Sequence, residues 1–434
     1  MQPMRDVVII GGGIAGLSAA WRLRDRDVLL IEAADRLGGR MRSDACGEYW
    51  LNYGAHLFPA PGTLVDTMAR ECDLVTVPVT GTMAGLAVRS RMLVNGRLET
   101  YPFRLPFSLR NRIAFARAGL KVRRAVARRV PTLDYEDDRT FGEFLGALPA
   151  EVEEIFACAT HRATADLDEL SAGCGIGLFA LVWDGKASLI ARNLLGGTGR
   201  LPEALGRKLA GRISLNTPAH AIESDGKTLL VDGIRTRHVI VAAQAPHAAP
   251  LVASVAPGTA DALSKITYGA FLSVAIATNE RAPMPWDGVY AIATPGRVFD
   301  MFTNQAHCLR TGTRHPGGSL MLFAGGRAAA ELSRESDEVI AARFLADLHD
   351  LYPKSRGIVA SAHVHRWELG NAYARPGRAR LQPALEGALG AHQNVHLAGD
   401  YFAELGNMEA AAQTGLAAAE RVDALLRARA APHA

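Results

Sequence analysis

Cysteine is scarce in this chain, with five residues among 434. They are odd in number and widely spaced, at Cys46, Cys72, Cys158, Cys174 and Cys308. This spacing excludes a disulfide-stabilised scaffold and gives no zinc-binding pattern, so we expect no metal site. It also predicts a reducing compartment, either the cytoplasm or the inner face of the membrane that encloses it.

Long apolar runs are also missing, although hydrophobic residues make up 49% of the chain. The most apolar stretch, 239–260, is broken at Gln244, Pro246, His247, Pro250 and Pro257. We therefore expect no membrane span. Residues 1–23 resemble a signal peptide only superficially, because Asp6 and a glycine-rich turn indicate that they begin a nucleotide-binding unit. We therefore expect no secretion signal. The length is sufficient for two domains, each with its own core.

Acidic residues are absent from the segment 101–133, which holds nine basic ones: Arg104, Arg110, Arg112, Arg117, Lys121, Arg123, Arg124, Arg128 and Arg129. Because the whole chain has a formal net charge of +4, the remainder carries −5. Apolar residues interleave, in part at helical spacing. Three interpretations stay open: a basic amphipathic helix on anionic lipid, attraction of an anionic substrate, and a solvated helix face. Nucleic acid is not expected, since no aromatic stacking pattern accompanies the charges.

A glycine-rich turn follows the first predicted strand, at residues 7–10. It consists of Gly11, Gly12, Gly13, Ile14, Ala15 and Gly16, and a second predicted strand at 28–31 ends at Glu32. The first glycine permits a tight turn, the second lets the backbone approach a pyrophosphate, and the third lets the helix pack on the sheet. Helical N–H groups then face the phosphates, and Glu32 accepts hydrogen bonds from a ribose. The sequence predicts that the chain binds an ADP-containing dinucleotide.

Two further motifs identify the kind of dinucleotide. The first follows the second strand, with Ala33, Arg36, Gly38, Gly39 and Arg40; the second lies near the other end, with Gly399, Asp400, Asn407, Met408 and Ala411. The pattern E-x-x-x-R-x-G-G-R with a distant A-G-D and M-E-x-A resembles the flavin-containing amine oxidoreductase superfamily. That superfamily includes monoamine and polyamine oxidases, protoporphyrinogen oxidases and phytoene-type desaturases. The resemblance implies that the cofactor is FAD.

The resemblance also implies the fold class, which is α/β. We expect a Rossmann-type FAD-binding domain, similar to that of glutathione reductase, and an interleaved α+β substrate domain. The FAD-binding domain is predicted to be discontinuous, with residues 1–76, 190–250 and 391–434, and the substrate domain to hold 77–189 and 251–390. Alternating residues predict short strands at 213–222, 228–231 and 238–243. The resemblance also implies that a turn at Thr217, Pro218 and Ala219, within the first of these segments, passes the adenine.

Further site residues follow from the resemblance, position by position. Gly54, Ala55 and His56 are placed near the flavin, where His56 is either catalytic or a hydrogen-bonded scaffold residue. Trp367 is either a cofactor contact or part of the core. Tyr373 takes the position of an aromatic wall beside the flavin. Ala372 stands where some members carry the cysteine that tethers the flavin, so non-covalent FAD is expected.

Other positions depart from the amine oxidase pattern. Asn407 stands where a second aromatic wall is expected, and Ser273 where many amine oxidases have a lysine. Residues 298–301 and 320–326 resemble desaturases instead, while 52–58 resembles UDP-galactopyranose mutase and protoporphyrinogen-oxidase-like proteins. No second nucleotide-binding motif for NADPH is found. Electrons are therefore expected to come from an organic substrate and to leave to oxygen or another acceptor.

The leading hypothesis is an FAD-dependent oxidase or desaturase that removes a hydride from a largely apolar molecule, such as a biosynthetic intermediate. Tyr373, Asn407 and His56 are the residues expected around the substrate. The alternatives are a flavin amine oxidase that forms an imine and a redox-neutral enzyme similar to UDP-galactopyranose mutase. Neither the substrate, the electron acceptor nor the oligomeric state follows from the sequence.

Overall fold

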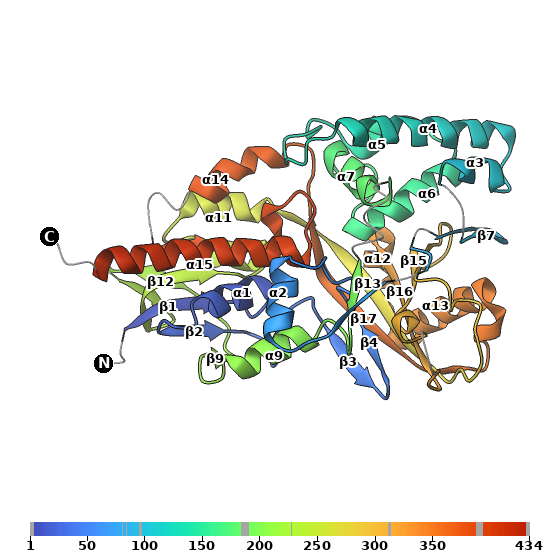
Figure 1. The fold of residues 1–434 in the computed structure, drawn as a ribbon. Helices are drawn as coiled ribbons and strands as arrows, with labels where there is room; N and C mark the ends of the chain where they lie inside the picture. The colour runs from blue at the N-terminus through green and yellow to red at the C-terminus, as the bar shows by residue number, and fades with distance from the viewer. Residues whose placement is uncertain are drawn as a thin grey trace.

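Two large sheets, each of seven strands, organise the molecule in a computed structural model. The structure describes residues 4–79, 81–83, 85–94, 98–183, 191–226, 228–310, 314–387 and 394–430. In Figure 1 the first sheet lies on the left with the chain termini, and the second lies on the right. Within the described residues, none of the helices combines the length and apolarity that a membrane crossing requires.

The first sheet is built around parallel strands. Its order is β10 (Ile222–Ser224), β11 (Leu229–Val231), β12 (Ile234–Val241), β1 (Arg5–Ile10), β2 (Val28–Ile31) and β9 (Ile213–Ser214), and β18 (Val395–Leu397) also pairs with β12. Strands β9, β2, β1, β12 and β18 run parallel, whereas β10, β11 and β12 form an antiparallel meander. Segments from the beginning, middle and end of the chain therefore share one sheet.

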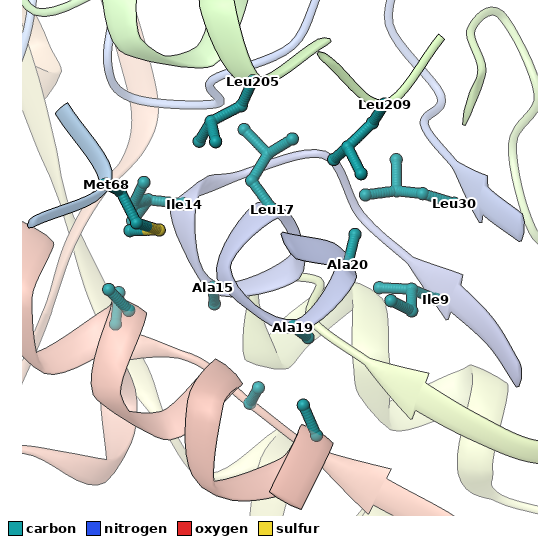
Figure 2. Packing of buried hydrophobic residues seen from close by; sticks show 14 of the residues in the cluster. Ile9, Ile14, Ala15, Leu17, Ala19, Ala20, Leu30, Met68, Leu205 and Leu209 are labelled. Carbon is teal, nitrogen blue, oxygen red and sulfur yellow. The ribbon is translucent and has the colours of Figure 1, made fainter. Parts of the chain in front are cut away.

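Helices cover both faces of this sheet. On one face Ile9 packs in a core with α1 (Ile14–Arg22), α2 (Leu64–Glu71), α9 (Arg200–Lys208) and α15 (Met408–Ala430); Figure 2 shows the side chains around α1. On the other face Val8 and Ile10 pack with α10 (Ala245–Val252), α11 (Pro257–Ser264) and a residue of α14 (Gln382–Gly387). Burial on both faces explains why residues 7–10 are uniformly apolar rather than alternating.

The second sheet is mainly antiparallel. Its order is β17 (Val359–Tyr373), β13 (Thr267–Thr278), β16 (Gly318–Gly325), β15 (Met301–Asn304), β14 (Ala291–Ala293), β6 (Gly85–Val88) and β7 (Arg91–Leu93). Helices α12 (Gly326–Leu332) and α13 (Asp337–Leu351) share a core with one face. A helical group, α3 (Tyr101–Arg104), α4 (Leu109–Arg128), α5 (Phe141–Leu145), α6 (Ala150–Thr160) and α7 (Ala172–Trp183), packs around buried aromatic rings. Figure 1 shows this group at the top right.

Short elements connect these parts. Two-stranded ribbons are formed by β3 (Ser43–Cys46) with β4 (Tyr49–Asn52) and by β5 (Thr76–Pro78) with β8 (Arg192–Leu194). The 3-10 helices are η1 (Leu98–Thr100), η2 (His161–Ala163), η3 (His307–Leu309), η4 (Pro353–Ser355), η5 (Arg378–Leu381) and η7 (Asp400–Phe402). The boundaries expected for the two domains stay a prediction, because sheet membership fixes only the strands.

One expected strand is broken in the structure. Residues 213–222 hold β9 and the first residue of β10, with a loop at 215–221 between them. Asn216 in this loop has φ of +52°, which interrupts an extended backbone. The backbone N–H of Thr217 then donates to the carbonyl of Glu32 at 2.8 Å. The break therefore turns the chain back toward the end of β2.

Candidate active site

A continuous cavity of about 2280 Å³ extends from the carboxyl ends of β1 and β2 to the second sheet. Its lining includes most of the residues predicted from the sequence: Gly11, Gly13, Ile14, Ala15, Glu32, Ala33, Arg36, Gly38, Gly39, Arg40, Gly54, Ala55, His56, Ala219, Trp367, Gly399, Asp400, Asn407, Met408 and Ala411. Two predicted residues, Gly16 and Tyr373, are not part of this lining. The motifs from both chain ends thus meet at one site.

The glycine turn places the start of α1 at the cavity. Gly13 caps this helix without a side-chain hydrogen bond, and a Cβ added at Gly13 would meet no atom within 4 Å. The first N–H groups of α1 and the positive end of its dipole are therefore open to an anionic group. Gly16 has another task, because a Cβ there would lie 1.9 Å from the Gly11 carbonyl oxygen. Its absence from the lining reflects this packing role.

Glu32 ends β2 beside this turn. Its carboxylate accepts hydrogen bonds from the N–H groups of Gly12, at 2.5 Å, and Ala34, at 2.8 Å. These bonds hold the carboxylate at the cavity edge, where its remaining lone pairs can accept bonds from a ribose. Ala219 lines the same end of the cavity from the loop before β10.

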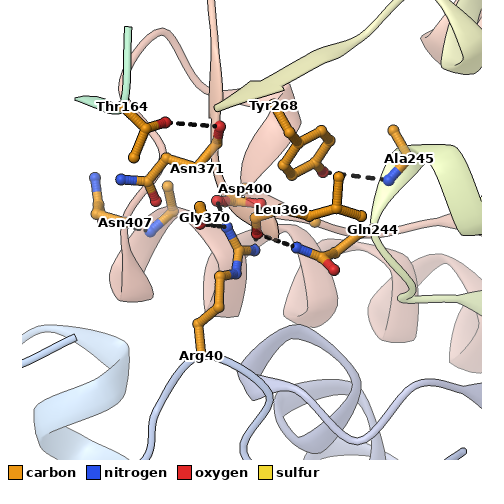
Figure 3. Close-up of polar contacts among 12 residues, drawn as sticks. Arg40, Thr164, Gln244, Ala245, Tyr268, Leu369, Gly370, Asn371, Asp400 and Asn407 are labelled. Carbon is orange, nitrogen blue, oxygen red and sulfur yellow. Dashed lines mark hydrogen bonds and ion pairs between the residues drawn. The ribbon is translucent and has the colours of Figure 1, made fainter. Parts of the chain in front are cut away.

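Arg40, which lines the cavity, joins three segments of the chain, as Figure 3 shows. Its guanidinium contacts both carboxylate oxygens of Asp400 at 2.8 Å and donates to the carbonyl of Gly370 at 3.1 Å. Burial alone would lower the pKa of Arg40, but the ion pair with Asp400 raises it above its ordinary value. The pair fixes the loop after Gly39 against η7 and β17.

Three consecutive carbonyls of β17 are held by side chains from three other segments. Gln244 donates to Leu369 at 2.7 Å, Arg40 to Gly370, and Thr164 to Asn371 at 3.3 Å; Figure 3 shows all three bonds. The pairing of β17 with β13 shifts register between Gly269 and Phe271, directly opposite this stretch. Leu369 and Gly370 therefore have no ladder partner, whereas Asn371 pairs with Gly269, and residues 366–372 line the cavity.

Trp367 lies both at the cavity and within the scaffold. Its indole N–H donates to the carbonyl of Tyr53 at 2.7 Å, and the guanidinium carbon of Arg36 lies 6.0 Å from its ring centroid. Arg36 also donates to the carbonyls of Leu37 and Gly39. Ser273 is buried, donates to the same Tyr53 carbonyl at 2.7 Å and does not line the cavity. Trp367 therefore both lines the cavity and contributes to the scaffold, and its contact with the cofactor stays a prediction.

The far end of the cavity is apolar and aromatic. His56 lies with its ring centroid 6.2 Å from that of Tyr290 and 5.9 Å from that of Phe323, and Phe271 and Met301 also line this end. Burial lowers the pKa of His56 to about 4, so its imidazole is uncharged at neutral pH. Its Nδ1 lies 3.3 Å from the Gly54 carbonyl. This end suits an organic molecule with substantial apolar surface.

The placement of Tyr373 argues against its expected role as an aromatic wall. Its side chain is buried in a cluster with Leu170, Cys174 and Leu178. Cys174 and Leu178 line the cavity, whereas Tyr373 does not. Burial raises the pKa of Tyr373 to about 12. Along β17, the ring that does line the cavity is that of Trp367, six residues earlier.

Asn407 lies at the cavity immediately before α15. Its Oδ1 accepts from the N–H of Ala410 at 2.9 Å, and its Nδ2 donates to the carbonyl of Leu405 at 3.0 Å. The amide therefore organises the start of α15 and contributes no second ring to the lining. Sequence reasoning missed Gln244 and Thr164 altogether, because each is recognisable only by its contact with residues far along the chain.

Comparison with known proteins identifies the class to which this fold and site belong. A family model described as flavin containing amine oxidoreductase matches residues 14–423, so the chain belongs to this family. The expected resemblance and the expected cofactor, FAD, are thereby confirmed.

Among curated proteins, the chain is similar to a flavin-containing amine oxidase of Oncorhynchus mykiss. The two are 25% identical over 270 residues, which cover 55% of this chain and 49% of that protein. Flavin-containing amine oxidase A of Canis lupus familiaris is 26% identical over 258 residues, covering 53% and 46%. The match thus spans about half the length of these relatives.

Solved structures give the same fold over nearly the whole chain. Cyclohexylamine oxidase of Brevibacterium oxydans superposes with a TM-score of 0.78 at 19% identity, covering 98% of this chain and 100% of that one. Putrescine oxidase bound to putrescine has a TM-score of 0.76 at 18% identity, covering 97% and 99%. A putative protoporphyrinogen oxidase of Exiguobacterium has a TM-score of 0.73 at 18% identity, covering 98% and 100%. The predicted fold class is confirmed.

Proposed function

We propose that the protein is an FAD-dependent oxidoreductase that removes a hydride from a carbon of a largely apolar organic substrate. Oxygen or another acceptor would take the electrons afterwards. The observation that carries this proposal is one continuous cavity with nucleotide-binding motifs at one end and aromatic and apolar side chains at the other. Bound FAD supplies the two-electron acceptor for the hydride.

The residues at the first end fit FAD in size and chemistry. The cavity of about 2280 Å³ exceeds the roughly 300–1,000 Å³ of a pocket for one drug-sized ligand, so it has room for a dinucleotide and a substrate. The start of α1 and Gly13 offer an anion site, and Glu32 offers a ribose acceptor. The segment 366–372 supplies a wall whose backbone is held by Arg40, Gln244 and Thr164.

We further propose that the cofactor is held without a covalent bond. All five cysteines lie in the described parts of the chain, and of these only Cys174 lines the cavity. Its thiol is buried in α7, lies 3.4 Å from the Glu404 carbonyl and has a pKa raised by burial to about 12. A thiol in this environment is a poor nucleophile. Acid precipitation should therefore release intact FAD into the supernatant, and flavin retained in the pellet would contradict the claim.

The side chains at the substrate end contribute placement and exclusion of water. His56 is uncharged, and burial raises the pKa of the Tyr290 hydroxyl, so neither carries a charge at neutral pH. The aromatic rings of Phe271 and Phe323 pack together with centroids 4.8 Å apart. Such a lining orients an apolar substrate and excludes water from the reacting carbon. Orientation of this kind accounts for a large part of the rate acceleration by enzymes.

The test is anaerobic mixing of the FAD-loaded protein with candidate substrates while the visible absorption band of oxidised flavin, which gives it its yellow colour, is recorded. We expect bleaching with an apolar substrate, and a slower rate when the reacting carbon carries deuterium. A substrate that is isomerised with no net flavin reduction would overturn the proposal in favour of mutase-like chemistry. The mass of the product then distinguishes the two reactions, because dehydrogenation lowers it and isomerisation leaves it unchanged.

An amine oxidase activity is the second candidate. It is favoured by the curated relatives and by the solved structures of cyclohexylamine oxidase and putrescine oxidase, all of which carry amine oxidase names. Against it, Asn407 adds no second ring to the cavity and Tyr373 does not line it. Flavin bleaching by simple amines, with imine formation, would establish this alternative.

We also propose peripheral contact between α4 and an anionic membrane. Large apolar side chains are exposed on and around this helix: Phe103, Leu109, Ile113, Leu120 and Val130, between 44% and 74% exposed. Arg110, Arg117, Arg124 and Arg128 accompany them and are exposed. Within the described residues, these four guanidinium groups have no ion pair. A surface that combines exposed apolar side chains with unpaired cations suits the headgroup region of anionic lipid.

A further inference from the structure

Arg162 lies in η2 beside the cavity, next to a histidine that faces the other way. His161 contacts Asp300 at 2.6 Å and Asp166 at 3.1 Å through its two ring nitrogens. Burial alone would lower the pKa of His161, but these two carboxylates raise it to about 9. His161 and the Arg327 guanidinium, which lies 3.1 Å from Asp166, together neutralise these two carboxylates. The side chain of Arg162 lines the cavity instead.

The other arginines in the cavity lining all have partners. Arg36 donates to the carbonyls of Leu37 and Gly39, Arg40 pairs with Asp400, and Arg366 pairs with Asp337. Within the described residues, the Arg162 guanidinium has neither a hydrogen bond nor an ion pair. The remaining acid near the far end, Glu99, pairs with Arg123 at 3.2 Å. Arg162 is thus a largely buried cation whose counter-charge the described chain does not supply.

An unpaired cation in such a place is unfavourable unless a ligand compensates it. Removing a charge from water costs free energy, and only a partner of opposite charge or several acceptors offset that cost. The environment of Arg162 is consistent with this, because burial lowers the pKa of its guanidinium. The aromatic rings of Tyr290 and Phe323 and the side chain of Leu178 line the same cavity and cannot replace a counter-charge.

We propose that the Arg162 guanidinium binds a carboxylate of the substrate, so that the substrate is an apolar carboxylic acid. The planar fork of a guanidinium matches the two oxygens of a carboxylate. The apolar remainder of the molecule would lie against the rings of Phe271, Tyr290 and Phe323. This proposal rests on the proposed function and narrows its substrate class.

The same charge disfavours simple amines. A protonated amine at the far end would meet the Arg162 cation, while His56 in the cavity lining is uncharged and Glu99 is already paired. Repulsion between like charges is strong where water is excluded. Arg162 thus gives a physical reason to expect selection of anionic over cationic substrates within a family named for amines.

The test compares two probes of the same shape, 3-phenylpropionate and 3-phenylpropionamide, by calorimetric titration of the FAD-loaded protein. We expect the wild type to bind the carboxylate at least about tenfold more tightly than the amide. Arg162→Gln should remove this preference, and Arg162→Lys should keep part of it. Arg343→Gln, an exposed arginine of α13, removes the same charge outside the cavity and should change neither affinity.

Three results would overturn the proposal. They are equal binding of the two probes by the wild type, equal weakening of both in Arg162→Gln, and loss of FAD in Arg162→Gln. The last would mean that the anion on Arg162 is a phosphate of the cofactor. If Arg162→Gln fails to fold, the probe ratio in Arg162→Lys decides. Because binding is measured without turnover, the two proposals can fail separately. A protein that prefers the carboxylate but whose flavin no substrate bleaches would refute the proposed function, and Arg162 would then be a carboxylate-binding site without that activity.

Discussion

The guanidinium of Arg40 meets the carboxylate of Asp400 at two points, with both N–O distances 2.8 Å, although the two residues are 360 positions apart. Asp400 is almost fully buried, and Arg40 also holds the Gly370 carbonyl. One ion pair thereby joins the glycine-rich N-terminal loop, the bulged strand β17 and the turn before α15. Stability and cofactor binding should both depend on it.

Asp400→Asn should destabilise the protein by about 3 kcal/mol, because it leaves the Arg40 charge without its partner inside the protein. Urea unfolding of the FAD-free protein measures this free energy. Asp27→Asn is the matched control: it breaks the exposed pair with Arg5, at 2.7 Å, and should cost less than about 1 kcal/mol. Equal effects of the two substitutions would show that the Arg40–Asp400 pair contributes no more than a surface pair.

Glu32→Gln should weaken FAD binding by about 1–3 kcal/mol, since the amide loses a charged acceptor for the ribose and for the Gly12 N–H. The dissociation constant can be measured by titrating FAD into the FAD-free protein and following flavin fluorescence. Glu203→Gln, on the exposed side of α9, removes an equal charge and should leave affinity unchanged. An unaltered constant for Glu32→Gln would refute the role of Glu32 as a ribose acceptor.

Phe323→Ala should raise KM for an apolar substrate about tenfold or more, because it removes a ring from the far end of the cavity. Tyr373→Phe should leave both kcat and KM unchanged, since the Tyr373 side chain lies outside the lining. Steady-state kinetics with a substrate found by the bleaching test measures both. A large loss in Tyr373→Phe would restore the original expectation for that residue.

Replacing Arg110, Arg117, Arg124 and Arg128 of α4 by Gln should abolish binding to phosphatidylglycerol vesicles, and wild-type binding should fall steeply as salt is raised. Exposed charges act only over a Debye length of about 8 Å at physiological ionic strength. The control replaces the exposed arginines Arg334, Arg343, Arg356 and Arg380. Co-sedimentation that is insensitive to salt, or equal for phosphatidylcholine, would leave α4 as a solvated face.

His238 and His396 should make the protein less stable as pH falls below about 6.5. The two rings lie 5.7 Å apart on neighbouring strands, and burial lowers their pKa values to about 4 and about 3. Between pH 6.5 and pH 4 the two imidazoles therefore stay uncharged in the folded protein, while in the unfolded chain they bind protons. The stability that is present above pH 6.5 is lost as the pH falls toward 4. The slope reaches about 1.4 kcal/mol per pH unit for each histidine.

Replacing both histidines by leucine should flatten the curve of unfolding free energy against pH in this window. His56 and His365, whose pKa values burial also lowers to about 4, remain in both proteins. The difference between the two curves therefore isolates the pair. If the curves of the wild type and the double variant run parallel from pH 6.5 to pH 4, the two imidazoles have the same pKa values in the folded and unfolded states.

The parts of the site that the sequence predicts are those with a local cause. The turn at Gly11, Gly13 and Gly16 and the acid at Glu32 follow from a strand, a helix and a second strand within a short stretch. Arg40 and Asp400 were predicted as separate motifs, but their ion pair depends on how the chain ends meet.

The differences from the expectations have a tertiary cause. The aromatic wall at Tyr373 stays a prediction that rests on likeness to a linear motif, whereas the cavity lining includes Trp367 and not Tyr373, and the pairing of β17 shifts register between them. The strand expected at 213–222 is broken at Asn216, whose positive φ no alternation of residues reveals. In the basic segment, Arg123 and Arg129 pair with Glu99 and Glu404, so the sequence overstates its free charge.

The position of α15 has a consequence for biosynthesis. Met408 and Ala411 at its start line the cavity, and β18, which precedes it, completes the first sheet beside β12. Because a ribosome makes these residues nearly 400 positions after the glycine turn, a nascent chain holds that turn long before it holds the opposite wall. Cofactor capture should therefore be a late event that follows synthesis of α15, and truncation within α15 should yield protein without bound FAD.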